Sequence, residues 1–156
     1  MKFISGACLL FCIYYIAEAV PVKDESRFCE EELKCIQELK LDKSYIESII
    51  TDDSSRFLPE DDDVFNTYLH CYWKARNFQN EKGILDFDNI MESIQFFPRK
   101  HFGGRPNDDS PIGVEIAAAA IEDCKHVPGG ESHGQTAVKM QNCIDRRMME
   151  LVEKEK

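Results

Sequence analysis

Two cysteines and two histidines near the C-terminal end of the chain are the residue types best suited to chemistry. Cys124 and Cys143 flank a stretch that contains His126 and His133. These are zinc-ligand types, but no closely spaced Cys-x-x-Cys or His-x3-His pair anchors the set, which disfavours a metal site. The missing Cys-x-x-Cys motif also argues against a thioredoxin-like redox centre. The pattern favours a structural disulfide bond, and we predict that no metal is bound.

Other catalytic patterns are also missing from the sequence. It contains no His-Glu-x-x-His, no Gly-x-Ser-x-Gly and no phosphate-binding glycine loop. Asp86-x-Asp88 lacks the rest of a calcium loop. The acidic run 60–63 favours a helix start on the solvated surface over a cation site, because negative charge suits a helix N-terminus. We therefore predict a protein that is not an enzyme and that has no cofactor.

The first nineteen residues, MKFISGACLLFCIYYIAEA, have the pattern of a secretory signal. Lys2 precedes a long apolar run, and Ala17 and Ala19 are the small residues of a cleavage site after Ala19. The alternative is a membrane anchor, but the run is short and Glu18 closes it without a basic stop. We predict a signal peptide over 1–19 and a single secreted, extracellular domain over 20–156, where disulfides are the default use of paired cysteines.

The charge of the chain excludes two classes of partner. Its formal net charge is −10 at pH 7. Nucleic acids and anionic membrane surfaces both need clustered positive charge, so neither is an expected partner, and no membrane insertion is expected after the signal.

The hydrophobic pattern predicts an all-α domain. Apolar residues recur at helical spacing, and no stretch shows convincing alternation with period two. Asp42 is the expected cap of the second helix, and Ser110 with Pro111 opens the fifth. We predict about six short helices, over 24–40, after Asp42, over 60–79, over 85–94, from 111 to about 125, and from about 135 towards the C-terminus.

Five cysteines remain after signal cleavage. A bridge between Cys124 and Cys143 would clip the last two helices together, and Cys35 and Cys71 could do the same for the first and third. Cys29 and Cys35 would lie about 9 Å apart along one helix, too far for a bond. Cys29 is therefore predicted to be a free thiol, with an intermolecular link as the alternative.

The cysteine spacing resembles that of the insect odorant-binding protein family, the pheromone-binding and general odorant-binding proteins. Cys35, in CIQELKLDKSYIESI, stands at the family's first cysteine, and Cys71, in TYLHCYWKARNFQNEKGILDF, at its third. Cys124 and Cys143, in CKHVPGGESHGQTAVKMQNC, stand at the fourth and sixth.

Two family cysteines are missing from this chain. Thr67 stands at the second position and Gly134 at the fifth, and these two are partners in one family bridge. The chain thus resembles the reduced-cysteine, or C-minus, members. The missing bridge predicts a looser junction between the third and sixth helices and a broader ligand range.

The resemblance implies a fold, a function and a site. The fold is six helices around an apolar cavity, with bridges Cys35–Cys71 and Cys124–Cys143. The function is a secreted carrier of small hydrophobic ligands such as odorants, pheromones or other apolar semiochemicals and lipids, with a membrane receptor or a homodimer as further candidate partners. The candidate lining residues are Ile49, Ile50, Phe57, Tyr72, Trp73, Phe87, Met91, Ile94, Phe97, Ile121 and Met140.

Two further features bear on the ligand. A hydroxyl of Tyr45, Tyr68 or Tyr72 could meet one polar ligand group. The histidines, at 70, 101, 126 and 133, are expected to be solvated surface residues, which we prefer to a pH-linked release of ligand. The alternative function is a salivary or venom-type protein of the same fold that scavenges mediators or binds a host protein through its surface, with the loop PRKHFGGR or a Cys29-linked dimer as the working surface.

Overall fold

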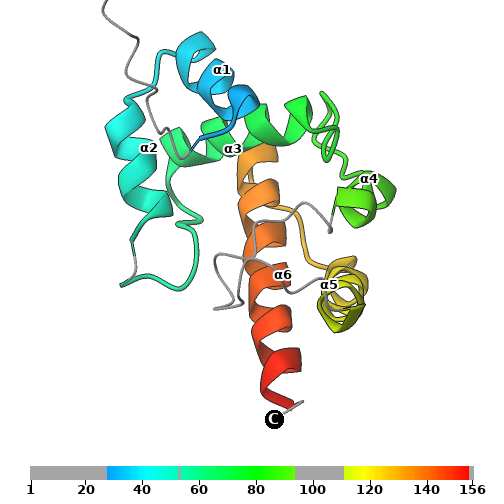
Figure 1. The fold of residues 1–156 in the computed structure, drawn as a ribbon. Coiled ribbons are helices and arrows are strands. Elements are labelled where there is room, and N and C mark those ends of the chain that lie inside the picture. The colour runs from blue at the N-terminus through cyan, green and yellow to red at the C-terminus, as the bar shows by residue number, and fades with distance from the viewer. Residues whose placement is uncertain (1–27, 53, 94–110, 155–156) are drawn as a thin grey trace, which may run out of the picture.

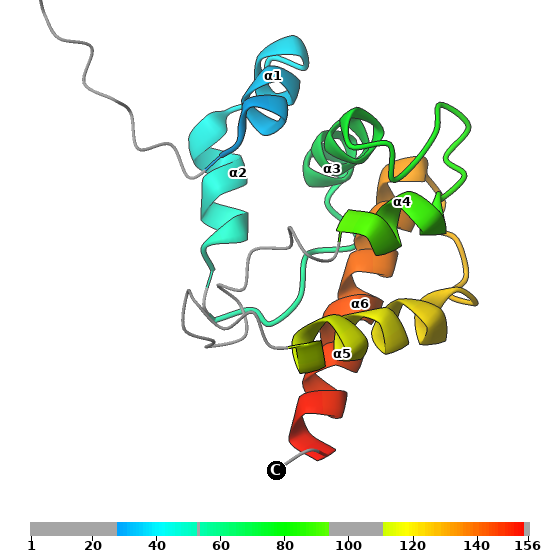
Figure 2. The ribbon, with the colours of Figure 1, turned by 45° about the vertical axis from the view of Figure 1, so that its right-hand side comes forward.

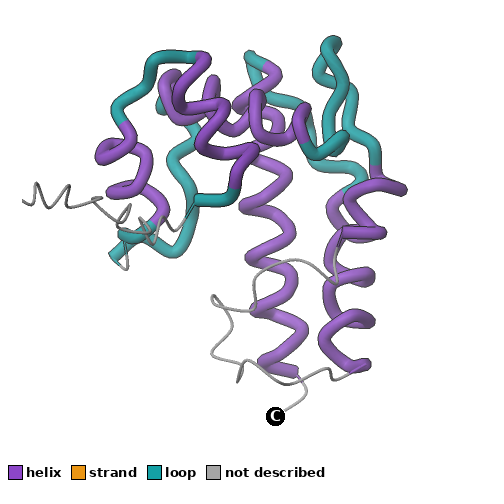
Figure 3. Tube along the Cα trace, turned by 45° about the horizontal axis from the view of Figure 1, so that its top comes forward, coloured by secondary structure: helices purple, strands orange, loops and turns teal. Residues whose placement is uncertain are grey.

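The structure is a computed structural model that describes residues 28–52, 54–93 and 111–154, with only the backbone of 111–113. These residues form helices and loops without a named strand, as Figure 3 shows. The helices are α1 (Glu30–Glu38), α2 (Lys43–Ile50), α3 (Asp63–Ala75), α4 (Phe87–Glu92), α5 (Pro111–Cys124) and α6 (His133–Lys154). The predicted all-α fold of six helices with two disulfides is confirmed.

Aspartates begin three of these helices. The carboxylates of Asp42, Asp62 and Asp86 accept hydrogen bonds from backbone N–H groups in the first turns of α2, α3 and α4. Such caps satisfy donors that have no partner within the helix. The predicted cap at Asp42 is confirmed, whereas α3 begins later than predicted because Asp62, inside the acidic run, is its cap.

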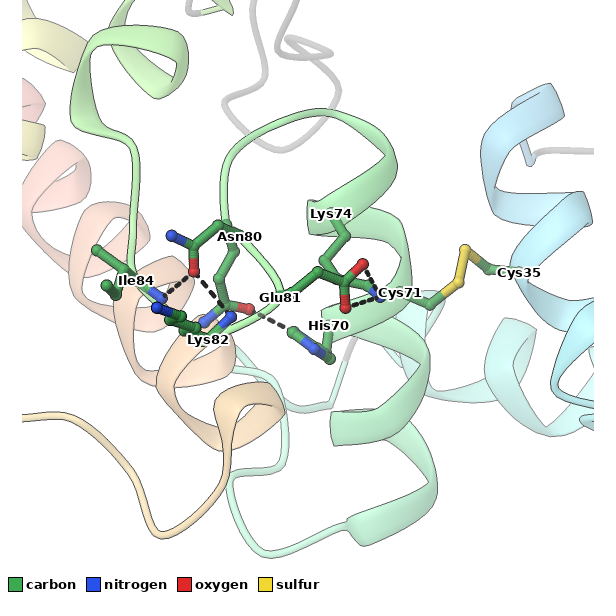
Figure 4. A network of polar contacts seen from close by, with 9 residues as sticks. Cys35, His70, Cys71, Lys74, Asn80, Glu81, Lys82 and Ile84 are labelled. Atoms are coloured by element: carbon green, nitrogen blue, oxygen red, sulfur yellow. Dashed lines mark hydrogen bonds and ion pairs between the residues drawn. A yellow bond between two sulfur atoms is a disulfide. The ribbon is translucent and has the colours of Figure 1, made fainter.

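The end of α3 also differs from the prediction. The helix ends at Ala75 because Asn77 adopts a left-handed conformation with φ of 59°. The chain then turns through Asn80 to Gly83, which has φ of 75°. The Asn80 side-chain oxygen accepts hydrogen bonds from the N–H groups of Lys82 and Ile84 (Figure 4). This turn brings the chain to α4.

The long helix α6 is the centre of the packing. Helix α3 lies against its N-terminal end and α5 packs beside it, while α1 packs on α3 (Figures 1 and 2). α1 and α2 lie on one side of this arrangement, and α4 and α5 on the other. The largest fully buried side chains come from helices α2 to α6, and they are Trp73, Tyr68, Phe65, Ile46, Ile90, Ile121, Met140, Val138 and Cys124.

Two disulfides tie these helices together. Cys35 of α1 is bonded to Cys71 of α3, with their Cα atoms 5.8 Å apart (Figure 4). Cys124 of α5 is bonded to Cys143 of α6, with Cα atoms 6.0 Å apart. This is the pairing that the resemblance implies, and Cys29 carries a free thiol. Among the described residues, no helix is both long and apolar enough to cross a membrane.

Candidate ligand-binding site

Three of the predicted cavity residues lie deep in the core. Trp73 of α3, Ile121 of α5 and Met140 of α6 expose at most 2 % of their surface. Trp73 packs edge-on against Phe78, with ring centroids 5.9 Å apart. These side chains fill the space between the helices.

Six further predicted residues are half-buried. They are Ile49 and Ile50 of α2, Phe57, Tyr72 of α3, and Phe87 and Met91 of α4. All of them except Phe57 pack against the core, so each offers apolar surface beside the interior. The last two predicted residues, Ile94 and Phe97, lie outside the described residues.

Two surface depressions lie among the described residues, and both are open to solvent. The first lies between residues 77–89 and Lys125 and includes the predicted residue Phe87. The second lies between Tyr45 and residues 59–64. Amide and carboxylate groups line much of both, which does not match an enclosed apolar cavity. The cavity lining therefore stays a prediction.

The segment that connects α2 to α3 is fixed to α6 by Asn142. Its side-chain oxygen accepts a hydrogen bond from the Leu58 N–H at 2.8 Å, and its amide donates to the Leu58 carbonyl at 2.9 Å. Asn142 exposes only 2 % of its surface. Arg146, one turn further along α6, lies over the Phe57 ring at 5.0 Å from its centroid. These contacts place Phe57 beside α6.

Sequence reasoning missed the role of Asn142. The available signal was the position of Asn142, which lies between Met140 and Ile144 on the apolar stripe of a helix. An amide that is buried at such a position requires hydrogen-bond partners. The identity of those partners depends on a contact across 84 residues, which no local pattern carries.

α3 and α6 touch directly where the family bridge is missing. A Cβ atom added to Gly134 would lie 2.0 Å from the backbone oxygen of Asn66. The two helix backbones therefore approach more closely than any side chain at position 134 would permit. Thr67 is exposed, and its hydroxyl donates to the Asp63 carbonyl. The looser junction and the broader ligand range that the missing bridge predicts stay predictions.

Gln79 joins the turn after α3 to two histidines. Its side-chain oxygen lies 2.7 Å from Nδ1 of His70, and its amide donates to the carbonyls of Gly83 and His133. The rings of His70 and His133 meet edge-on, with centroids 5.3 Å apart. Figure 4 shows His70 beside the ion pair of Lys74 and Glu81.

His70 is thus half-buried and bonded, and its predicted place on the solvated surface is wrong, because Gln79 folds back against α3. His126 and His133 are exposed, as predicted, and His101 lies outside the described residues. The described residues contain no group of three or more His, Cys, Asp and Glu side chains placed to hold a metal ion.

The three tyrosines proposed as polar anchors have different surroundings. The Tyr68 hydroxyl is buried and donates to Glu32 at 2.9 Å, and the Tyr45 hydroxyl donates to Asp62. Among the described residues, no group forms a hydrogen bond with the Tyr72 hydroxyl, which is not one of the buried polar atoms left without a partner. Burial, and then the charge of Glu32, raises the pKa of Tyr72 above its ordinary value. Its hydroxyl therefore keeps its proton at physiological pH.

The architecture defines a class of protein: a small all-α domain with one disulfide between α1 and α3 and another between α5 and α6. Residues 17–147 match the model of the PBP/GOBP family, and the chain belongs to this family. Proteins of this family bind and carry small hydrophobic molecules and are not enzymes. Comparisons with curated proteins and with solved structures gave no match.

Proposed function

We propose that this protein is a secreted carrier that encloses a small hydrophobic ligand between its helices and transports or sequesters it. The observation that carries the proposal is the family match over residues 17–147, which includes all four bridged cysteines. Odorants, pheromones, and other apolar semiochemicals or lipids are the proposed ligand class. Residues 1–19 are proposed to be a signal peptide that is removed on export.

The half-buried apolar side chains support this proposal. A hydrocarbon ligand that contacts them loses its own exposure to water, and this hydrophobic burial supplies most of the affinity. At roughly 0.5 kcal/mol per atom, a ligand of about fifteen heavy atoms binds with a Kd on the micromolar scale. The methionine among them can adapt its shape to different ligands.

Binding of a fluorescent apolar probe, N-phenyl-1-naphthylamine, tests the proposal. We expect saturable binding in the micromolar range and displacement of the probe by candidate volatiles. Met91→Gln should weaken probe binding several-fold because it places an amide at a half-buried apolar position. Val114→Gln is the matched control, since Val114 is 46 % exposed on α5. Probe binding that no volatile displaces, or that Met91→Gln and Val114→Gln change equally, would contradict the proposal.

A further inference from the structure

Helix α2 stands at the edge of the molecule, apart from the long helix α6 (Figures 1 and 2). In the described part of the chain, α2 makes no extended contact with another helix, and Ile46 is its one fully buried residue. The two disulfides join α1 to α3 and α5 to α6, so neither of them holds α2. A helix attached in this way can open locally at a lower cost in free energy than the helices that form the core.

The connecting segment, residues 54–61, joins α2 to α3 and contains no fully buried residue. Side chains of α6 hold its backbone. Asn142 bonds to both the N–H and the carbonyl of Leu58, at 2.8 and 2.9 Å. The amide of Gln135 donates to the Glu60 carbonyl at 3.2 Å. The hold of α6 on the connecting segment is therefore largely polar.

The pair of hydrogen bonds between Asn142 and Leu58 can be broken and formed again at a small net cost. In the closed arrangement, the Asn142 side chain is buried and both ends of its amide have partners. When the segment lifts, water replaces each partner, so the net loss for each bond is small. An apolar side chain at position 142 would instead leave the two backbone groups of Leu58 without partners in the closed arrangement.

The elements on either side of α2 and the connecting segment are fixed to each other. α1 precedes α2, α3 follows the connecting segment, and the disulfide between Cys35 and Cys71 joins these two helices. Between them lie three half-buried residues of the predicted lining, Ile49, Ile50 and Phe57. Lifting of α2 and the connecting segment would therefore uncover apolar surface while the frame of α1 and α3 stays in place.

We propose that α2 and the connecting segment form a flap through which the ligand enters and leaves, and that Asn142 is the positioning residue that holds this flap closed. The inference rests on the proposed function, because it concerns the route of the same ligand to the interior. The flap is closed in both the empty and the loaded protein. Asn142 therefore controls the rate of ligand exchange and has little effect on Kd.

Stopped-flow mixing with the probe N-phenyl-1-naphthylamine tests this role on the variant Asn142→Leu. Loss of the two hydrogen bonds to Leu58 should raise the association and dissociation rate constants together, by about tenfold, and leave Kd within about twofold of the wild-type value. Gln141→Leu is the matched control, because the amide of Gln141 donates to Asp145 within α6. This control should keep both wild-type rate constants.

Cleavage by trypsin after Arg56 reports on the flap without any ligand. Arg56 is exposed, but a protease needs the surrounding chain to open, so the rate of cleavage follows the open population. Asn142→Leu should speed this cut about tenfold, because it removes the bonds that close the flap. The cut after Lys82, in the turn before α4, should keep its wild-type rate.

Three results would overturn the inference. Rate constants that Asn142→Leu leaves unchanged would do so, and so would a dissociation rate constant that rises alone, which shows lost packing. If Asn142→Leu does not fold, amide hydrogen exchange of the wild type decides. The amides of α2 and Leu58 should exchange together and faster than those in the middle of α3 and α6, and equal protection would overturn the inference. If the wild type binds no probe, the carrier function fails, whereas the tryptic cut and the amide exchange still test the opening of the flap.

Discussion

At the scale of single residues, the surroundings of Cys29 decide what its thiol can do. Cys29 caps the N-terminus of α1, a position that normally favours a thiolate. Here burial has the larger effect, and with hydrogen bonds to the Glu31 and Glu32 side chains it raises the pKa of the thiol from 9.0 to about 11. The thiol is therefore a poor nucleophile at neutral pH, which favours a free thiol over a covalent link between two copies.

The alkylation rate of Cys29 tests this assignment. At pH 8, a pKa of about 11 in place of 9.0 leaves about a hundredfold less thiolate, so iodoacetamide should react about a hundredfold more slowly than with the unfolded chain. The rate should rise with pH up to about 11, because deprotonation supplies the reactive form. The Cys29→Ser variant gives the background. Rapid labelling of the folded protein at pH 8 would contradict the raised pKa.

At the scale of helices, the contact between α3 and α6 is the least tolerant of change. Gly134 lets the backbone of α6 rest on the Asn66 carbonyl, where a Cβ atom would lie at 2.0 Å. Because the atoms nearest to this Cβ belong to the backbone of Asn66, no side-chain rotation can relieve the clash. The helices would have to move apart.

Gly134→Ala should therefore destabilise the protein, by about 1–3 kcal/mol, the usual cost of overpacking. The change is measured as a lower midpoint of urea unfolding. Gly129→Ala is the control, because a Cβ atom there would meet only the Thr136 hydroxyl at an ordinary 3.6 Å. Equal midpoints for the two variants would show that the α3–α6 contact is not as tight as described.

The helices themselves could be predicted from the sequence, because caps and apolar spacing are local signals. Asp42 opens α2 as predicted, and Pro111 is the first residue of α5. The exact start of α3 could not be predicted, because any of the three consecutive aspartates at 61–63 can serve as a cap. The contacts of Asn142 and Gly134 escaped prediction for a different reason. They join residues far apart in the chain, and the family pattern marks position 134 only as the place of a missing cysteine.

At the scale of the whole molecule, the secreted product is defined by the site of signal cleavage and by the pairing of its cysteines. A eukaryotic cell that expresses the full chain should secrete residues 20–156, beginning at Val20. Two disulfides leave one thiol, so the unreduced protein should be lighter than the reduced one by four hydrogen atoms and carry one alkylation site after unfolding. Intact-mass measurement and N-terminal sequencing check both statements. A product that retains residues 1–19, or a disulfide-linked dimer that dissociates into monomers on reduction, would contradict them.

The two disulfides also determine which peptide-bond cuts would divide the molecule. A protease nick between Cys35 and Cys71, or between Cys124 and Cys143, leaves the fragments joined through sulfur. A nick between Cys71 and Cys124 leaves no covalent link between the halves, because the position of the third family bridge is occupied by Thr67 and Gly134. After such a nick, only noncovalent contacts, chiefly the packing of α3 on α6 and the hydrogen bonds between Asn142 and Leu58, would keep the N-terminal and C-terminal pieces associated, and a denaturant alone, without a reductant, would separate them.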